Sequence, residues 1–169
     1  AMGNGYAITS VLGKDKIMNN IKNTFVSSTF WTERIGPAAA LKTIEIMEKK
    51  KSWKIITSRG KYIIDNYKKI AKKNNLKIII KGIPALCSFY FESKNNNAYK
   101  TYITQEMLKY GFLATNVVYL STAHSKLIID KYLKKMNIIF KEIREFEDGK
   151  DVYSYLETQL ATESFSRLN

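Results

Sequence analysis

The sequence predicts an α+β fold, and three observations carry that prediction. Two apolar stretches rich in β-branched and aromatic residues flank Gly82-Ile83-Pro84, which is the pattern of two strands joined by a turn. Long segments elsewhere place apolar residues at three- and four-residue spacings, which indicates amphipathic helices. The chain of 169 residues is 45% hydrophobic and 12% aromatic, enough to bury a core. Helices that alternate with short strands and turns are typical of an α+β domain.

The first fifty residues predict one strand and two helices. The β-branched segment before Gly13 favours a short strand. Ser28 or Thr29 is chemically suited to cap the long helix that follows, because a hydroxyl oxygen accepts a bond from an early helical N–H. Pro37 falls early in that helix, where its missing N–H is tolerated. The expected elements are a strand over 6–12, a short helix over 14–22 and a long helix over 32–50.

The remaining residues predict a hairpin and several helices. Asn74-Asn75 ends one long helical pattern, and Gly111 suits the left-handed residue that closes another helix. Ser125 stands directly before a third helical pattern of about twenty residues. The expected elements are helices over 53–74 and 99–110, strands over 76–81, 86–92 and 116–121, a helix from Ser125, and a short helix with a tail in the last twenty residues.

The chain is strongly basic, with a formal charge of +13 and a pI of about 9.7. Residues 49–81 hold 12 Lys or Arg against the single acid Asp65. Such a segment could bind nucleic acid. However, only 4 of the 28 basic residues are arginine, the better side chain for bidentate recognition of phosphates and bases. A solvated lysine face is therefore preferred, and nucleic acid is not expected as a partner, although a basic nucleic-acid-binding module without catalysis stays as an alternative.

The cysteine content favours a reducing compartment, because the single Cys87 cannot form an internal disulfide. Cys87 lies in an apolar run and is expected to be a buried small hydrophobe rather than a nucleophile. The longest apolar stretch, 76–91, contains Lys77 and Lys81 and is too short to cross a bilayer. These features predict a cytoplasmic protein with no membrane partner, and no spacing suggests a metal site.

Several motifs, in order along the chain, resemble the class III, fold type I aminotransferases that depend on pyridoxal phosphate (PLP), glutamate-1-semialdehyde aminomutases among them. The opening Gly3-Asn4-Gly5 is similar to the stretch that follows the family's Schiff-base lysine, with Asn4 in place of the commoner glycine. The other matching segments are 26–30, 32–41, 105–113, 120–125, 129–130 and 165–169.

The resemblance implies the C-terminal part of such an enzyme. Residues 1–30 would be the last strand and linker of the large PLP-binding domain. Residues 31–169 would be an interdomain helix and the small C-terminal domain, an antiparallel sheet with helices on one face. The parent would be a homodimer that moves an amino group between a small-molecule amino donor and a carbonyl acceptor. The family's lysine would stand directly before Ala1, so no catalytic residue is expected in this chain, and alone it is expected to be inactive.

The resemblance also implies site residues. The threonine at the position of Thr29 bonds the cofactor phosphate of the neighbouring subunit, and Ser28 is a weaker second choice. Gly5 would shape the turn beside the cofactor and substrate. A glutamate that faces the substrate in the aminomutases is replaced by Asn116, which favours an aminotransferase over a strict aminomutase, although the aminomutase stays as an alternative. Asn116 could equally be a residue of a strand-start turn.

A structural role is preferred for His124, and the roles of Glu33 and Arg34 stay open in part. His124 is the only histidine and could act as a general base. The resemblance places it at a corner between a strand and a helix, so orientation of that corner is the preferred role. Glu33 resembles the family's helix-entry acid and suits the positive end of a helix dipole. Contact of Glu33 or Arg34 with substrate or with a partner subunit stays open.

Overall fold

The computed structural model describes residues 2–27, 29–30 and 32–161. The chain divides into two compact units, 1–52 and 53–169, and each is described by itself. The expected boundary at residue 30, between a large cofactor domain and the rest, stays a prediction.

The first unit contains short helices and one long helix. The helices are α1 (Asp15–Met18), the 3-10 helix η1 (Asn19–Asn23) and α2 (Ile35–Lys50). The short helix and the long helix are confirmed, but α2 begins three residues later than the expected start at Thr32. The predicted strand over 6–12 is wrong: a strand forms only with a ladder partner, and among the described residues of this unit none pairs with it.

The second unit contains a three-stranded antiparallel sheet with the order β1-β2-β3. The strands are β1 (Ile78–Ile83), β2 (Leu86–Phe91) and β3 (Val117–Tyr119). The β1–β2 register pairs Ile80 with Phe89 and Ile83 with Leu86, so the expected hairpin is confirmed. Gly82, which pairs with Cys87 near the end of β1, has a φ of 87°, a left-handed conformation that glycine adopts without strain.

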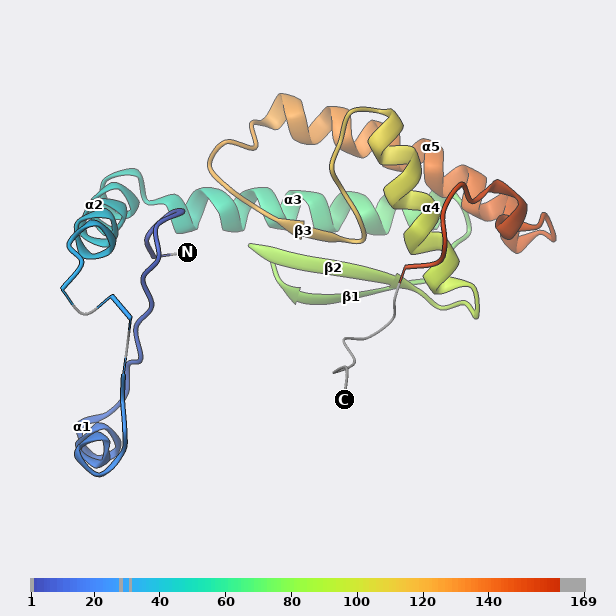
Figure 1. The fold of residues 1–169 in the computed structure, drawn as a ribbon. Helices are drawn as coiled ribbons and strands as arrows, with labels where there is room; N and C mark the ends of the chain where they lie inside the picture. Colours follow the sequence, from blue (N-terminus) through green and yellow to red (C-terminus); the bar gives the residue numbers. More distant parts are fainter. Residues whose placement is uncertain (1, 28, 31, 162–169) are drawn as a thin grey trace. The chain divides into compact units, whose positions relative to one another are not determined.

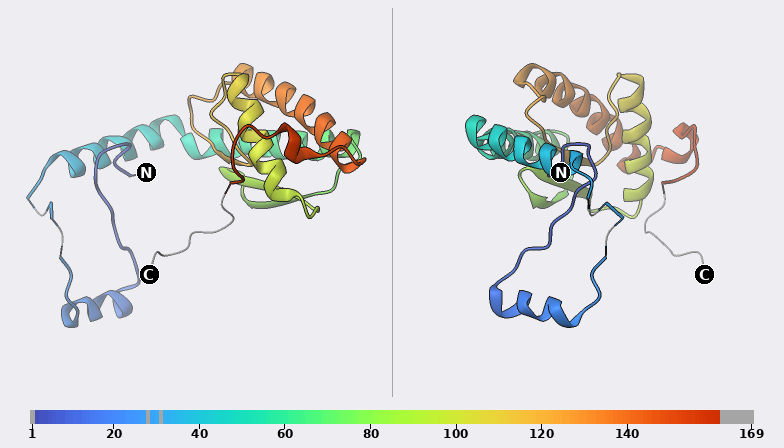
Figure 2. Two further views of the ribbon diagram at one scale, coloured as in Figure 1. Left: turned by 45° about the vertical axis from the view of Figure 1, so that its right-hand side comes forward. Right: turned by 60° about the vertical axis from the view of Figure 1, so that its left-hand side comes forward.

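Three helices cover one face of this sheet (Figure 1). Cys87, Phe89 and Phe91 of β2 are buried and join one core with side chains of the helices, whereas the alternate residues Ser88 and Tyr90 stay half-buried. Figure 2 shows the same layering from two other directions. The helices are α3 (Ser52–Lys73), α4 (Asn96–Lys109) and α5 (Lys126–Glu147), followed by the 3-10 helix η2 (Val152–Tyr155).

The ends of these helices follow the expected signals in part. Ser125 caps α5, because its hydroxyl oxygen accepts a hydrogen bond from the Ile128 N–H at 3.3 Å. Gly111, with a φ of 80°, follows α4 in the predicted left-handed conformation. However, α4 begins at Asn96, three residues before the expected start at Tyr99.

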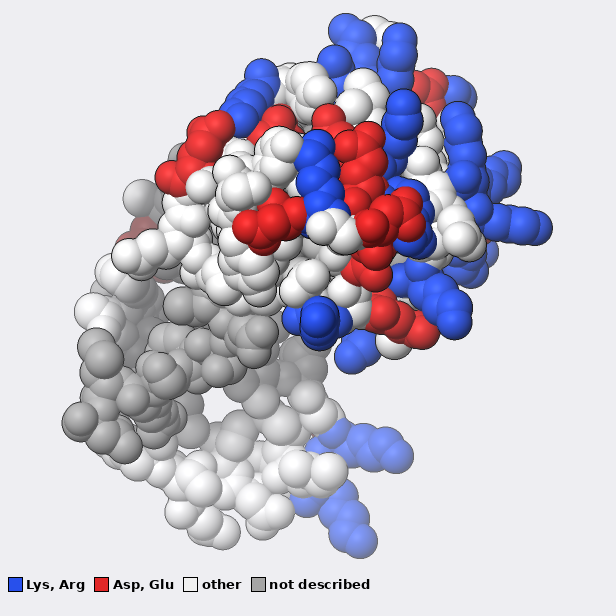
Figure 3. All heavy atoms as spheres, turned by 90° about the vertical axis from the view of Figure 1, so that its right-hand side faces the viewer, with Lys and Arg blue, Asp and Glu red and all other residues white. Residues whose placement is uncertain are grey.

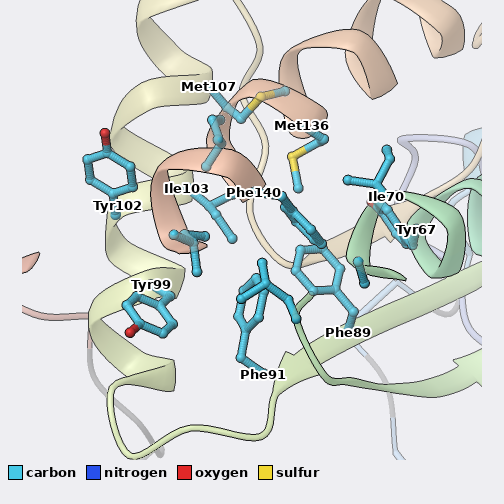
Figure 4. Close-up of a cluster of buried hydrophobic side chains, with 14 of the residues drawn as sticks. Tyr67, Ile70, Phe89, Phe91, Tyr99, Tyr102, Ile103, Met107, Met136 and Phe140 are labelled. Carbon is cyan, nitrogen blue, oxygen red and sulfur yellow. The ribbon is translucent and has the colours of Figure 1, made fainter. Parts of the chain in front are cut away.

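Aromatic rings fill the core between the sheet and the helices (Figure 4). The ring of Phe140 lies 5.5 Å from that of Phe89 and 5.1 Å from that of Phe91, measured between centroids. The Tyr67 and Tyr132 hydroxyls bond to each other inside this core. Cys87 is 1% exposed, as expected of a buried small hydrophobe, and burial raises the pKa of its thiol.

One glycine sets how closely α3 approaches the hairpin. Gly60 is buried, and a Cβ at this position would lie 1.8 Å from the carbonyl oxygen of Pro84 in the β1–β2 turn. Only a residue without a side chain therefore permits this packing.

No helix within the described ranges is long and apolar enough to cross a membrane.

Candidate functional site

The glycine-containing turn near the start of the chain has a left-handed backbone at two residues. Gly5 has a φ of 111° and Asn4 a φ of 47°. A Cβ at Gly3 would lie 2.3 Å from the Tyr6 carbonyl oxygen, so the turn is closed tightly on itself. A Cβ at Gly5 would meet no atom within 4 Å. The backbone at Gly5 is therefore open to close approach by another group.

This turn continues into a segment that lies against the start of α2. Gly36 is buried in the first turn of α2, and a Cβ there would lie 2.7 Å from the carbonyl oxygen of Ala7 and 3.3 Å from Ile8. Glycine at position 36 thus lets the backbone after the turn come close to the helix. The segment after the glycine turn and the start of α2 are thus neighbours within the first unit.

The start of α2 differs from the expected cap. Thr29 does not cap it: the N-cap is Arg34, and the Glu33 carboxylate accepts hydrogen bonds from the Ile35 N–H at 2.8 Å and the Gly36 N–H at 3.4 Å. A carboxylate at this end is favoured by the free N–H groups and the helix dipole. The helix-entry role of Glu33 is confirmed.

Thr29 and Ser28 are the positions expected to contact the cofactor phosphate. Thr29 is exposed, five residues before the N-cap Arg34, and has no hydrogen-bond partner among the described residues. Its hydroxyl is therefore free to bond an outside group. Ser28 lies outside the described residues. Phosphate contact stays a prediction for both.

In the second unit, His124 holds a corner, in line with the preferred structural role. Its ring Nδ1 accepts a hydrogen bond from the Ser121 N–H at 3.1 Å, and the backbone N–H of His124 donates to the Ser121 carbonyl at 3.3 Å. These two bonds close the turn that leads from β3 into α5. Arg59 of α3 supports the same turn by donating to the Ser121 and Thr122 carbonyls at 3.3 and 2.9 Å.

Asn116 extends the sheet by means of its side chain. Asn116 is 5% exposed. Its side-chain Nδ2 donates to the Phe89 carbonyl at 3.0 Å, and its backbone carbonyl accepts from the Phe89 N–H at 3.0 Å. The side-chain amide thus continues the β2–β3 ladder one residue beyond Val117. The structural role weighed for Asn116 is present in the fold, and contact with substrate stays a prediction.

A pocket of about 520 Å³ lies between the loop after α4, strand β3 and the start of α5. Its walls are mainly apolar, and His124, Thr104 and Thr115 supply polar groups. An apolar cavity with a few polar groups is the usual form of a small-molecule site. Sequence reasoning did not find this pocket, although the apolar run Phe112-Leu113-Ala114 directly after a helix C-cap was its signal.

Within the part of the chain that the structure describes, no group of three or more His, Cys, Asp or Glu side chains could hold a metal ion.

Comparisons with known proteins show what the chain is similar to. A solved structure of the FumI protein of Sphingopyxis sp. MTA144, in its PLP internal aldimine form, matches with a TM-score of 0.75 and 19% identity. The match covers 91% of this chain and 38% of that one. It shows the fold, and so confirms the predicted α+β architecture.

Curated proteins with similar sequences include an aminotransferase and an aminomutase. A 3-aminobutyryl-CoA aminotransferase of Cloacimonas acidaminovorans is 30% identical over 106 residues, which are 62% of this chain and 26% of the relative. A glutamate-1-semialdehyde 2,1-aminomutase of Sulfurisphaera tokodaii is 26% identical over 159 residues, which are 84% of this chain and 38% of the relative. The chain thus spans well under half of the length of these relatives.

The family model of the class-III aminotransferases matches residues 1–142. That range includes the glycine turn, the start of α2, Asn116 and the His124 corner, and it confirms the expected resemblance. The chain belongs to the class-III aminotransferase family.

Proposed function

We propose that the protein to which this chain contributes is a PLP-dependent enzyme that moves an amino group between a small amino donor and a carbonyl compound. The match of the family model over residues 1–142 carries this proposal. The names of the relatives, one an aminotransferase and one an aminomutase, support it. When bound, PLP supplies the electron sink for the chemistry, and the protein orients the cofactor and the substrate.

Two features of the first unit fit a bound phosphate compound. The Thr29 hydroxyl is exposed and has no partner within the described ranges, so it can donate to a phosphate oxygen. The open backbone at Gly5 lets a flat ring approach closely. We therefore assign phosphate contact to Thr29, with Ser28 as a second contact, and a wall of the cofactor and substrate pocket to Gly5.

Asn116 supports an aminotransferase rather than an aminomutase proper. By the resemblance, it stands where the aminomutases carry a glutamate that faces the substrate. Here the side chain is a neutral amide that is buried and bonded to the Phe89 carbonyl. No carboxylate is therefore available at this position to act on the substrate. Contact of Asn116 itself with substrate is kept as part of the proposal.

The oligomeric state is proposed from the family, and the compartment is proposed from the cysteine content. We propose a homodimer, since the family's phosphate contact comes from the neighbouring subunit. The single cysteine, buried in the core, suits a reducing compartment, and we propose the cytoplasm.

The test uses the whole protein that includes this chain, loaded with PLP. Adding an amino donor should change the visible absorption of the bound cofactor, and adding a carbonyl acceptor should restore it with release of a new amine. Glutamate 1-semialdehyde separates the two activities, because an aminomutase converts it to 5-aminolevulinate without an outside acceptor. Isomerisation without an acceptor would favour the aminomutase, and a cofactor spectrum indifferent to every amino donor would contradict both.

A further inference from the structure

A groove of about 690 Å³ opens where α3 ends, β1 begins and the last turns of α5 pass by. Both acidic and basic residues line it. Figure 3 shows that Lys and Arg side chains gather along one side of the face drawn there, while Asp and Glu side chains gather nearer its middle. The lining includes Lys68, Lys72, Leu76, Lys77, Phe91 and Arg144.

Three cations of this groove are uncommitted. Within the described part of the chain, the ammonium groups of Lys68, Lys72 and Lys77 have no hydrogen-bond or ion-pair partner. Lys68 and Lys72 stand four residues apart on α3, so they project from the same side of the helix as neighbours. Lys77 comes from the segment just before β1 and lines the same groove. Together they present adjacent positive charges from two segments.

Two of the other charged groups of the groove, Arg144 and Glu147, already have partners within the protein. Arg144 donates to the Asn75 carbonyl at 3.1 Å and pairs with Asp148, so it forms a fixed wall. Glu147 accepts a hydrogen bond from the Tyr99 hydroxyl at 2.6 Å. With Glu92 as the remaining acid, the lining carries four cations and two anions, a net charge of +2. This charge suits a compact anion.

The floor of the groove is apolar. Leu76 and Phe91 are 9% and 7% exposed, and Ala71 lies between the lysine positions of α3. An organic body can rest on such a floor while its charged end meets the lysines. Lysine binds phosphate as a point charge, and neighbouring ammonium groups fit neighbouring phosphates better than a single carboxylate.

We propose that this groove binds a small organic diphosphate, of the class of a nucleoside diphosphate. The two phosphates meet Lys68, Lys72 and Lys77, and the organic body lies over Leu76 and Phe91. The carboxylate of Glu92 is placed to accept hydrogen bonds from sugar hydroxyls. A long nucleic-acid strand fits less well, because Glu92 and Glu147 interrupt the positive charge at the groove itself.

The test measures binding of adenosine diphosphate to the full 169-residue chain by calorimetry, with adenosine and inorganic pyrophosphate as comparison compounds. One site is expected, with an affinity for adenosine diphosphate at least about tenfold above that for either compound. Added salt should weaken binding, since the contacts are exposed ion pairs. Absence of binding, or equal affinity for adenosine, would overturn the proposal. Equal affinity for pyrophosphate would overturn the role of the apolar floor and leave an anion site only.

Matched variants locate the site. Lys68→Gln/Lys72→Gln/Lys77→Gln should lower the affinity by at least about tenfold. Lys61→Gln/Lys69→Gln/Lys73→Gln removes the same charge from exposed positions of α3 that do not line the groove, and should lower it by less than about twofold. Equal losses in the two variants would show a general positive field and overturn the groove site. Tighter binding of a single-stranded oligonucleotide, weakened equally by both variants, would show a nucleic-acid surface instead. Thermal melting checks that both variants fold, which their exposed positions favour.

Discussion

Replacing Asn116 by alanine is expected to destabilise the 53–169 unit by about 1–3 kcal/mol, the usual cost of leaving a buried polar group without its partner. The amide of Asn116 donates to the Phe89 carbonyl at 3.0 Å, and Phe89 is fully buried. Alanine keeps the backbone bond from the Phe89 N–H and removes only the side-chain donor. The substitution therefore removes one hydrogen bond from the core and leaves the Phe89 carbonyl without this donor.

Asn116→Asp adds a pH signature to the same position. An ionised aspartate cannot donate to the Phe89 carbonyl and would carry a buried charge, so its loss of stability near neutral pH should exceed that of alanine. Burial raises the pKa of such a carboxyl above its unfolded value. The folded state then binds more protons than the unfolded state, so stability should fall as pH rises through that window and recover in acid.

Urea unfolding, followed by tyrosine fluorescence and near-UV circular dichroism, measures these differences. Asn137→Ala is the matched control, because Asn137 is half-buried on α5 and makes no side-chain hydrogen bond among those described. It should be neutral or slightly stabilising, since alanine is the better helix former. A loss below about 0.5 kcal/mol in Asn116→Ala, or a pH-independent Asn116→Asp, would refute the ladder role of this side chain.

Two further changes test the packing of the same unit. Gly60→Ala should lower the free energy of unfolding by about 1–3 kcal/mol, because a Cβ there would overlap the Pro84 carbonyl. Ser58→Ala, on the exposed side of α3, is the control and should be nearly neutral. Similar melting temperatures for the two variants would contradict this close approach. Burial raises the pKa of Glu142 above its ordinary 4.5, so the folded state holds the proton more tightly and its carboxyl contributes a loss of stability as pH rises through that window. Glu142→Gln, which keeps an acceptor for the Tyr102 hydroxyl, should flatten that part of the pH profile of unfolding, and an unchanged profile would count against it.

Much of the fold could be predicted because it depends on local signals. The Ser125 cap of α5, the hairpin around Gly82 and the left-handed Gly111 each follow from the chemistry of one or two residues. The three- and four-residue spacing of apolar residues similarly indicated that α3 is an amphipathic helix. These elements were predicted correctly to within a few residues.

The remaining features depend on partners that a single sequence does not reveal. The β-branched segment 6–12 has strand chemistry but no ladder neighbour in its unit. Arg34, rather than Thr29, is the N-cap of α2, and Glu33 accepts bonds from the first helical N–H groups, because the helix begins later than its apolar pattern suggested. The ladder bond of Asn116 and the pairing of Gly60 with Pro84 join residues that are far apart in the sequence.

The proposal that this chain helps to hold pyridoxal phosphate is tested most directly at Thr29. The measurement is the dissociation constant of PLP from the whole protein that includes this chain, for Thr29→Ala and Thr29→Ser. A hydrogen bond to a charged group contributes about 1.5–3 kcal/mol, so alanine should weaken binding by roughly one to two decades. Serine keeps the hydroxyl and should leave the constant nearly unchanged. An alanine variant that holds PLP as tightly as the unmodified protein would contradict the assignment.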